Sequence, residues 1–113
     1  MKKSKDVNWP RYEARAEIVK ALAHPTRLMM VEELGRGERC VCELRARADA
    51  DMSTVSKHLT ILRNAGIVAY EKRGLRMFYR LCCPCLTGFI DCVEAVLRQN
   101  AKLQMRVLRS SAA

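Results

Sequence analysis

The segment DMSTVSKHLTILRNAG, from Asp51 to Gly66, constrains the fold of this 113-residue chain more than any other. Apolar residues recur in it at helical spacing and form one buried stripe: Met52, Val55, Leu59 and Leu62. The opposite side carries small, polar and basic side chains but no acid: Ser53, Thr54, Ser56, Lys57, Thr60, Arg63 and Asn64. An N-cap at Asp51 or Ser53 and a left-handed residue at Gly66 are expected at its ends. Because such a face suits base edges and phosphates, we predict a recognition helix.

The flanking segments predict the rest of a DNA-binding motif. Apolar and aromatic residues alternate over 68–72 and again over 77–81, and the KRGLR between them supplies Gly74 for a hairpin turn. Upstream, VCELRARA from Val41 to Ala48 predicts a short helix at helix-turn-helix spacing. The predicted fold is therefore mainly α with a small β-hairpin, a winged helix-turn-helix.

The charge distribution indicates a nucleic-acid partner. The formal net charge is +9, and between Ser53 and Arg80 six Lys or Arg accompany a single acid, Glu71. We therefore predict double-stranded DNA as a partner. Candidate base contacts are Ser53, Thr54, Ser56 and Lys57, and the further DNA-binding candidates are His58, Arg63, Lys72, Arg73 and Arg76. The side chain of His58 could contact a DNA phosphate or could instead form a local hydrogen bond within the protein.

The termini and remaining helices complete the predicted organisation. Residues 1–8 are expected to be a disordered basic arm, 9–109 a winged-helix DNA-binding and dimerisation domain, and 110–113 a frayed tail. Helices are expected over 11–23 and from Pro25 to Leu34, with His24 at their junction in a structural role rather than as a metal ligand. A terminal helix over 86–108 carries an apolar stripe at near-heptad spacing. A chain this short cannot hide that stripe alone, so the stripe indicates a homodimer.

Membrane and export signals are not evident in the sequence. No apolar run approaches the length of a membrane span, and no hydrophobic signal core follows the basic MKKSKD. We therefore expect no membrane partner and a cytoplasmic location, where the six cysteines would stay reduced.

Four separated motifs resemble the ArsR family of thiol-metal-responsive transcriptional repressors. They are AHPTRL, ERCVCEL, STVSKHLTILRNAGIV and EKRGLRMFYRL, in that order, and the resemblance extends from about Ala14 to Leu97. It implies a winged-helix homodimer, paired through its first and last helices. It also implies that the dimer binds operator DNA when ligand-free and releases it when an inducer binds.

Cys40 and Cys42 are the first candidate sensor residues. Residues at i and i+2 point apart on a helix, so these thiols can share an ion only if Cys40 precedes the regular helix. A helix N-terminus flanked by Arg39 and Arg45 favours the thiolate form. The motif resembles the family's metal-sensing motif, which implies As(III) or Sb(III), or cadmium and lead with additional cysteines. The third cysteine of the arsenite-type motif is Arg45 here, and the N-terminal arm holds no cysteine, so further ligands must come from elsewhere.

A second cysteine group, CCPC, precedes the last helix. It consists of Cys82, Cys83 and Cys85, with Cys92 two turns later as either a ligand or a small core residue. The group could form a trigonal site, complete a site with Cys40 and Cys42 of either subunit, or hold a second ion. We predict a non-enzymatic repressor whose inducer is As(III), Sb(III) or another thiophilic metal ion.

Other functions fit the same cysteines. A thiol-redox or persulfide-sensing repressor of the same fold is the main alternative. A small thiol oxidoreductase would need a βαβ framework that this pattern lacks. A four-cysteine structural zinc site is disfavoured, because the spacing from Cys40 to Cys42 is not that of a usual zinc knuckle.

Overall fold

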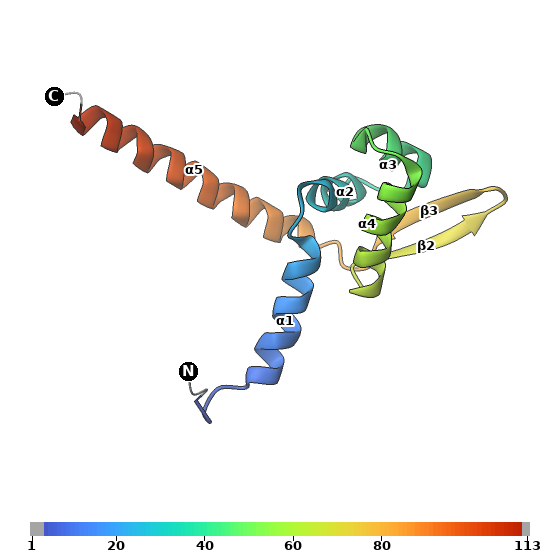
Figure 1. Ribbon diagram of the computed structural model, residues 1–113, viewed down its shortest axis with the longest axis horizontal. Helices are drawn as coiled ribbons and strands as arrows, with labels where there is room; N and C mark the ends of the chain where they lie inside the picture. Colours follow the sequence, from blue (N-terminus) through green and yellow to red (C-terminus); the bar gives the residue numbers. More distant parts are fainter. Residues whose placement is uncertain (1–3, 112–113) are drawn as a thin grey trace.

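The computed structural model describes residues 4–111 and has the predicted winged helix-turn-helix fold. Helices α3 and α4 lie beside a β-hairpin, while α1 and α5 project away from them in different directions (Figure 1). The elements are α1 (Trp9–Leu22), α2 (Pro25–Gly35), β1 (Arg39–Cys40), α3 (Val41–Ala48), α4 (Met52–Asn64), β2 (Val68–Arg73), β3 (Arg76–Leu81) and α5 (Leu86–Ser111).

Helix α4 begins and ends as its sequence predicts. Asp51 is the N-cap, and its carboxylate accepts a hydrogen bond from the Thr54 backbone N–H at 2.8 Å. Beyond the other end, Gly66 has a φ of +78°, a left-handed conformation that glycine adopts without strain. Val55, Leu59 and Leu62 are buried, but Met52 is 36% exposed. The prediction that Met52 belongs to the buried stripe is wrong, because the first turn of α4 lies at the edge of the core.

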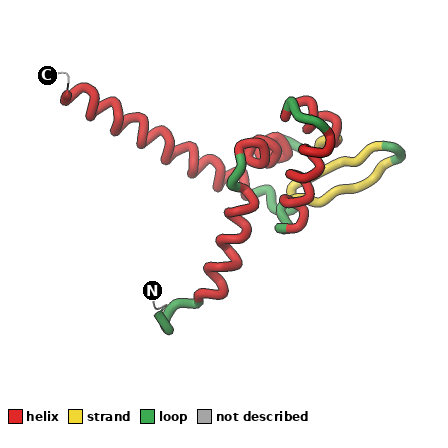
Figure 2. The backbone as a smooth tube through the Cα atoms, viewed as in Figure 1, coloured by secondary structure: helices red, strands yellow, loops and turns green. Residues whose placement is uncertain are grey.

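The three strands form one antiparallel sheet in the order β1-β3-β2. In the hairpin, Tyr70 lies opposite Tyr79 and Val68 opposite Leu81, so the alternation predicted for the two strands is confirmed. Figure 2 shows the hairpin extending away from the helices. Strand β1 was not predicted, since two residues are too few to show alternation. It pairs with β3 and places Cys40 opposite Phe78.

The hydrophobic core lies where α2, α3 and α4 meet the base of the hairpin. Its side chains come from all of these elements and the end of α1: Ala21, Leu22, Met30, Val31, Leu34, Leu44, Val55, Leu59, Leu62, Ile67, Val68 and Leu81. The first turns of α5 contact this core through Leu86 and Ile90. The core therefore fixes the helix-turn-helix, the base of the hairpin and the start of α5 relative to one another.

Most of α1 and α5 is not covered by the rest of the chain. Large exposed apolar residues are Tyr12, Ile18 and Val19 on α1, and Phe89, Val93, Val96, Leu97, Leu103, Met105, Val107 and Leu108 on α5. The radius of gyration is 18.3 Å. A compact chain of this length would have about 13 Å. The two helices thus present apolar faces that a second chain could cover.

The ends of the described chain differ from the sequence prediction. Helix α5 continues to Ser111, beyond the predicted domain end at Arg109. Residues 4–8 form a turn in which the Trp9 indole N–H donates to the Ser4 carbonyl at 3.1 Å. The remaining parts of the predicted arm and tail, 1–3 and 112–113, lie outside the described residues. Across residues 4–111, each helix is too short or too polar to span a membrane.

Candidate nucleic-acid interface and thiol pairs

The outward face of α4 is polar and open to solvent. Ser53, Thr54, Ser56, Lys57 and Thr60 are exposed there. Two hydroxyls have partners within the helix, since Ser53 donates to Asp51 at 3.1 Å and Thr60 donates to the Ser56 carbonyl at 2.8 Å. Lys57 forms no ion pair with any residue in the described part of the chain. Its ammonium group is therefore available for a phosphate or a base edge.

The basic side chains of α4 and the hairpin have different surroundings. The Arg63 guanidinium lies 5.1 Å from the centre of the Tyr70 ring, a cation–π contact that joins α4 to β2. Arg73 donates to Glu38 at 3.0 Å and to Glu71 at 2.8 Å, and it also lies over the Phe78 ring. Both carboxylates, Glu38 first, raise the pKa of Arg73. The Arg73 charge is thus partly neutralised by Glu38, which precedes β1, and by Glu71 of β2.

Lys72 and Arg76 lie beside the hairpin turn and are free for a phosphate, while Arg80, also exposed and without an ion pair within residues 4–111, lies near the base of the hairpin. Lys72 and Arg76 are both exposed, and neither forms an ion pair with a residue between 4 and 111. The sequence proposed Lys72, Arg73 and Arg76 alike as DNA contacts. The structure favours Lys72 and Arg76, because a guanidinium already held by two carboxylates attracts a phosphate less strongly. DNA contact by each of the three remains a prediction.

His58 lies on the side of α4 that faces α2. It is half-buried, its ring centre is 4.3 Å from that of His24, and its Nδ1 lies 3.4 Å from an Arg27 nitrogen. Burial lowers the pKa of His58, and the nearby His24 and Arg27 lower it further. His24 caps α2, since its Nδ1 accepts the Thr26 backbone N–H at 3.1 Å. His58 thus contacts Arg27, 31 residues away in the sequence, so whether it hydrogen-bonds locally or contacts a phosphate stays a prediction, while His24 lies at the junction of α1 and α2 that its motif predicts.

The first thiol pair lies at the boundary between β1 and α3. Cys40 is buried and extended, Cys42 is exposed in the first turn of α3, and their sulfur atoms are 2.7 Å apart. The Cys42 thiol donates to the Cys40 sulfur, which lowers the pKa of Cys40 and raises that of Cys42. The Arg76 charge lowers the pKa of Cys40 further and offsets only part of the rise in the pKa of Cys42. The Glu43 carboxylate accepts the Cys40 backbone N–H at 3.1 Å and so fixes the turn.

This pair supplies two sulfur donors and the described chain adds no third. Cys42 lines a shallow groove with Arg45, Ala46, Asp49 and Ala50, and Arg45 stands where a third cysteine would be needed. Within residues 4–111, His, Cys, Asp and Glu side chains form no group of three or more that could hold a metal ion. Between residues 4 and 111, three thiols are therefore not placed together as a trigonal As(III) or Sb(III) site would require.

A second thiol pair lies between β3 and α5. The sulfur atoms of Cys83 and Cys85 are 2.8 Å apart, and both residues are exposed, as are Cys82 and Cys92. Cys40 lies opposite Phe78 in the sheet, and Cys82 follows Phe78 by four residues, about 13 Å along an extended chain. Two sulfurs bound to one zinc-like ion lie at most about 4.6 Å apart. Within one chain the two pairs cannot share an ion without a large movement.

Comparison with known proteins identifies the family. Residues 24–70 match the model of the bacterial regulatory protein, arsR family. The chain is 37% identical over 95 residues to the biofilm growth-associated repressor of Agrobacterium fabrum, a match that covers 80% of this chain and 81% of that protein. The chain belongs to the ArsR family.

Solved structures place this ArsR-family protein among winged helix-turn-helix domains. It superposes on the crystal structure of Rv0081 from Mycobacterium tuberculosis with a TM-score of 0.76 and 32% identity, covering 85% of this chain and 97% of that one. The homodimeric winged helix-turn-helix DNA-binding domain of Mb0332 from Mycobacterium bovis gives a TM-score of 0.73 at 25% identity, with 90% and 94% covered. The sheet is antiparallel, so the βαβ framework of a thiol oxidoreductase is not found in residues 4–111 of this ArsR-family chain.

Acidic residues around the first thiol pair were missed by the sequence argument. Glu33 is 13% exposed and contacts three arginines, Arg36 at 3.1 Å, Arg47 at 3.3 Å and Arg39 at 3.9 Å. Glu38 binds Arg73 of the hairpin. The sequence does contain a signal for these residues, because acidic residues lie on both sides of the RCVC segment. In this ArsR-family protein, their ion pairs connect α2, β1, α3 and the hairpin.

Proposed function

We propose that this regulator is a repressor that binds operator DNA as a homodimer. The observation that carries the proposal is the acid-free, exposed face of α4, which lies beside a hairpin with free cations at Lys72 and Arg76. The exposed apolar faces of α1 and α5, together with the homodimeric state of the Mycobacterium bovis relative, support assembly into a dimer. A dimer places one α4 in each of two successive major grooves.

Operator recognition can be tested with the purified, reduced protein. Footprinting should show protection of an imperfect inverted repeat whose half-sites are about ten base pairs apart, or a multiple of that spacing. Analytical ultracentrifugation should show a dimer on the DNA. Binding by a monomer with equal affinity for all sequences would refute the proposal.

We infer that Cys40 and Cys42 are the inducer site of this repressor. The pair starts α3, which positions α4, and β1 joins the same pair to the hairpin through β3. The inducer proposed from the sequence is As(III), Sb(III) or another thiophilic ion, and reduced thiols of the kind found in the cytosol are required. Because one chain contributes two sulfurs, an inorganic trigonal ion needs a third donor from the partner chain or from solvent. Binding would release DNA only by stabilising a conformation with lower operator affinity.

The alternative inducer is an oxidant or a persulfide donor. The closeness of the Cys40 and Cys42 sulfurs and the lowered pKa of Cys40 favour this second chemistry. Parallel titrations of operator-bound protein with arsenite and with a mild oxidant distinguish the two. In each titration, Cys40→Ser/Cys42→Ser should retain DNA binding and lose release, while Cys92→Ser serves as the matched control. Normal release from the double variant would exclude this pair as the inducer site.

A further inference from the structure

The Cys83–Cys85 pair is built into the turn that starts α5. The Leu86 backbone N–H donates to the Cys83 carbonyl at 3.1 Å, and the Gly88 N–H donates to the Cys85 carbonyl at 3.0 Å. The Thr87 hydroxyl donates to the Pro84 carbonyl between them at 3.0 Å. A ligand that bridges the two sulfurs therefore acts directly on the backbone segment that connects β3 to α5.

Other thiols are poorly placed to complete a site with this pair. Cys42 follows Cys40, and Cys40 lies opposite Phe78, from which β3 continues for three residues, about 10 Å, before the bend that leads to Cys83. Cys92 lies seven residues beyond Cys85 on α5, about 10 Å along the helix axis. Cys82 is adjacent in sequence but forms no sulfur contact with either thiol in the described chain, and its backbone N–H is bound to the Ile67 carbonyl at 2.9 Å. The junction is thus a two-sulfur site.

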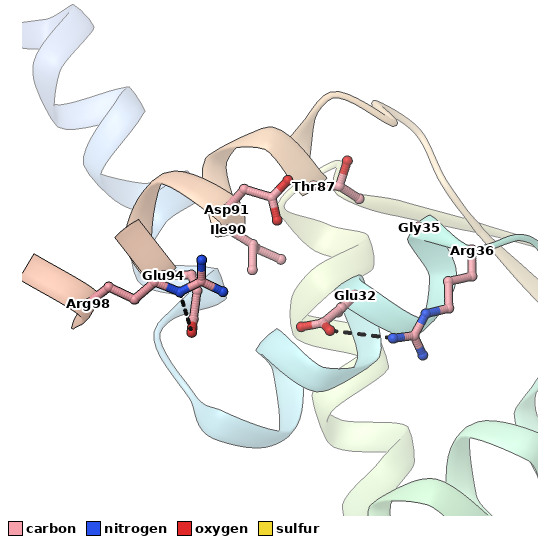
Figure 3. A pocket seen from close by; sticks show the side chains of 8 residues that line it. All are labelled: Glu32, Gly35, Arg36, Thr87, Ile90, Asp91, Glu94 and Arg98. Carbon is pink, nitrogen blue, oxygen red and sulfur yellow. Dashed lines mark ion pairs between the residues drawn. The ribbon is translucent and has the colours of Figure 1, made fainter. Parts of the chain in front are cut away.

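The start of α5 can transmit a change in this turn. A groove of about 560 Å³ separates α2 from α5 and is lined by Glu32, Gly35, Arg36, Thr87, Ile90, Asp91, Glu94 and Arg98 (Figure 3). The ion pairs drawn there, Arg36 with Glu32 and Arg98 with Glu94, each stay within one helix. Among the described residues no ion pair crosses the groove, so a tilt of α5 breaks none and has to rearrange only the packing of its first turns, where Leu86 and Ile90 contact the core.

A small tilt at this point becomes a large displacement. Helix α5 contains 26 residues. It is therefore about 39 Å long, and a tilt of about 10° at its first turn moves its far end by about 7 Å. Since α5 carries most of the exposed apolar face, such a tilt changes how two chains, and their two α4 helices, are placed relative to each other.

We propose that Cys83 and Cys85 form a second effector site, separate from Cys40 and Cys42, which binds a trivalent thiophilic centre bearing one substituent of its own and changes the tilt of α5. A monosubstituted arsonous acid, R–As(OH)₂, has this chemistry. Two As–S bonds form and two As–O bonds break, each hydroxide leaves as water with a thiol proton, and arsenic remains trivalent. The effect on DNA rests on the proposed repressor function, whereas binding and tilt do not.

Binding is tested with phenylarsine oxide, which hydrates to such an acid, and intact-mass spectrometry of the reduced full-length protein. Wild type should gain two phenylarsenic groups per chain, and Cys83→Ser/Cys85→Ser should gain one. Cys82→Ser and Cys92→Ser are matched controls and should still gain two. Retention of two groups by Cys83→Ser/Cys85→Ser, or loss of one in Cys82→Ser, would overturn the assignment. The single variants Cys83→Ser and Cys85→Ser, with melting temperatures checked, exclude a folding defect as the cause.

The effector role is tested in Cys40→Ser/Cys42→Ser, where only the second pair remains. Phenylarsine oxide should change its radius of gyration in solution scattering and lower its operator affinity by about 5-fold or more. The variant lacking all four cysteines should show neither change. An adduct without a change in scattering or affinity would refute the effector role. If the protein bound no operator at all, the proposed function would fail, and the mass and scattering results would still decide this inference.

Discussion

Thr87, in the first turn of α5, lies so close to Gly35, the last residue of α2, that a Cβ atom on Gly35 would be 2.3 Å from the Thr87 Cγ2. Gly35→Ala should therefore push α5 away from α2. The χ1 angle of threonine is stiff, and the Thr87 hydroxyl is held by the Pro84 carbonyl, so the methyl group cannot easily turn aside. We expect a loss of about 1–3 kcal/mol in the free energy of unfolding, measured by urea denaturation.

Thr87→Ser is the matched variant for this contact, because serine keeps the hydroxyl and removes the methyl group. Alone it should be nearly neutral, and combined with Gly35→Ala it should recover most of the lost stability. Additive effects of the two substitutions would show that the Gly35–Thr87 approach is not the cause.

Lys57→Ala should weaken operator binding by about 1–3 kcal/mol if Lys57 contacts a base edge. Fluorescence anisotropy against the operator and against a variant with one altered base pair per half-site provides the measurement. Loss of discrimination at one base pair is the expected signature. Equal weakening for every sequence would instead assign Lys57 to a phosphate.

Arg73 and Arg76, the two arginines next to the hairpin turn, should differ in their effect on DNA binding. Arg76→Ala should weaken binding to all sequences and reduce the slope of log affinity against log salt by about one, as for one lost phosphate contact. Arg73→Ala removes exposed ion pairs with Glu38 and Glu71, so it should lower stability only slightly and change the salt slope less than Arg76→Ala does. A larger slope change for Arg73→Ala would reverse this assignment.

His58 should make stability depend on pH in a defined window. Its pKa in the folded protein lies below the ordinary 6.5, so the unfolded chain binds more protons once the pH falls beneath 6.5. The stability that depends on neutral His58 is present above pH 6.5 and is lost as the pH falls toward the lower folded pKa. His58→Gln should lose less stability than wild type over this interval in thermal melts. Parallel curves for the two proteins would contradict the prediction.

The sequence predicted the parts of the fold that depend on local patterns. The cap at Asp51, the left-handed Gly66 and the facing of Tyr70 and Tyr79 follow from residue type and spacing, and the structure confirms them. Strand β1 could not be predicted, because its pairing with β3 is a long-range contact of only two residues. The exposure of Met52 depends on where the core ends, which periodicity within one helix does not define.

For the candidate sites, the sequence supplied residue types but not their partners. It required Cys40 to precede the regular helix before it could meet Cys42, and the structure places Cys40 in β1. It grouped Arg73 with Lys72 and Arg76, because a run of cations does not reveal that Glu38, 35 residues away, binds one of them. The sequence also left open whether all the cysteines form one shared site. The pairing of β1 with β3 shows that the Cys40–Cys42 pair and the Cys83–Cys85 pair lie apart in the fold.

If a second copy of the chain covers the apolar faces of α1 and α5, as proposed above, the protein's concentration becomes part of its regulation. A chain whose partner covers those faces gains stability by mass action, so folding and assembly become one equilibrium that depends on concentration. Growth that dilutes the protein lowers the folded fraction together with the dimer, and unpaired chains are exposed to proteases for longer. For the homodimeric repressor proposed above, the synthesis rate would therefore set a threshold concentration below which target genes escape repression even without inducer.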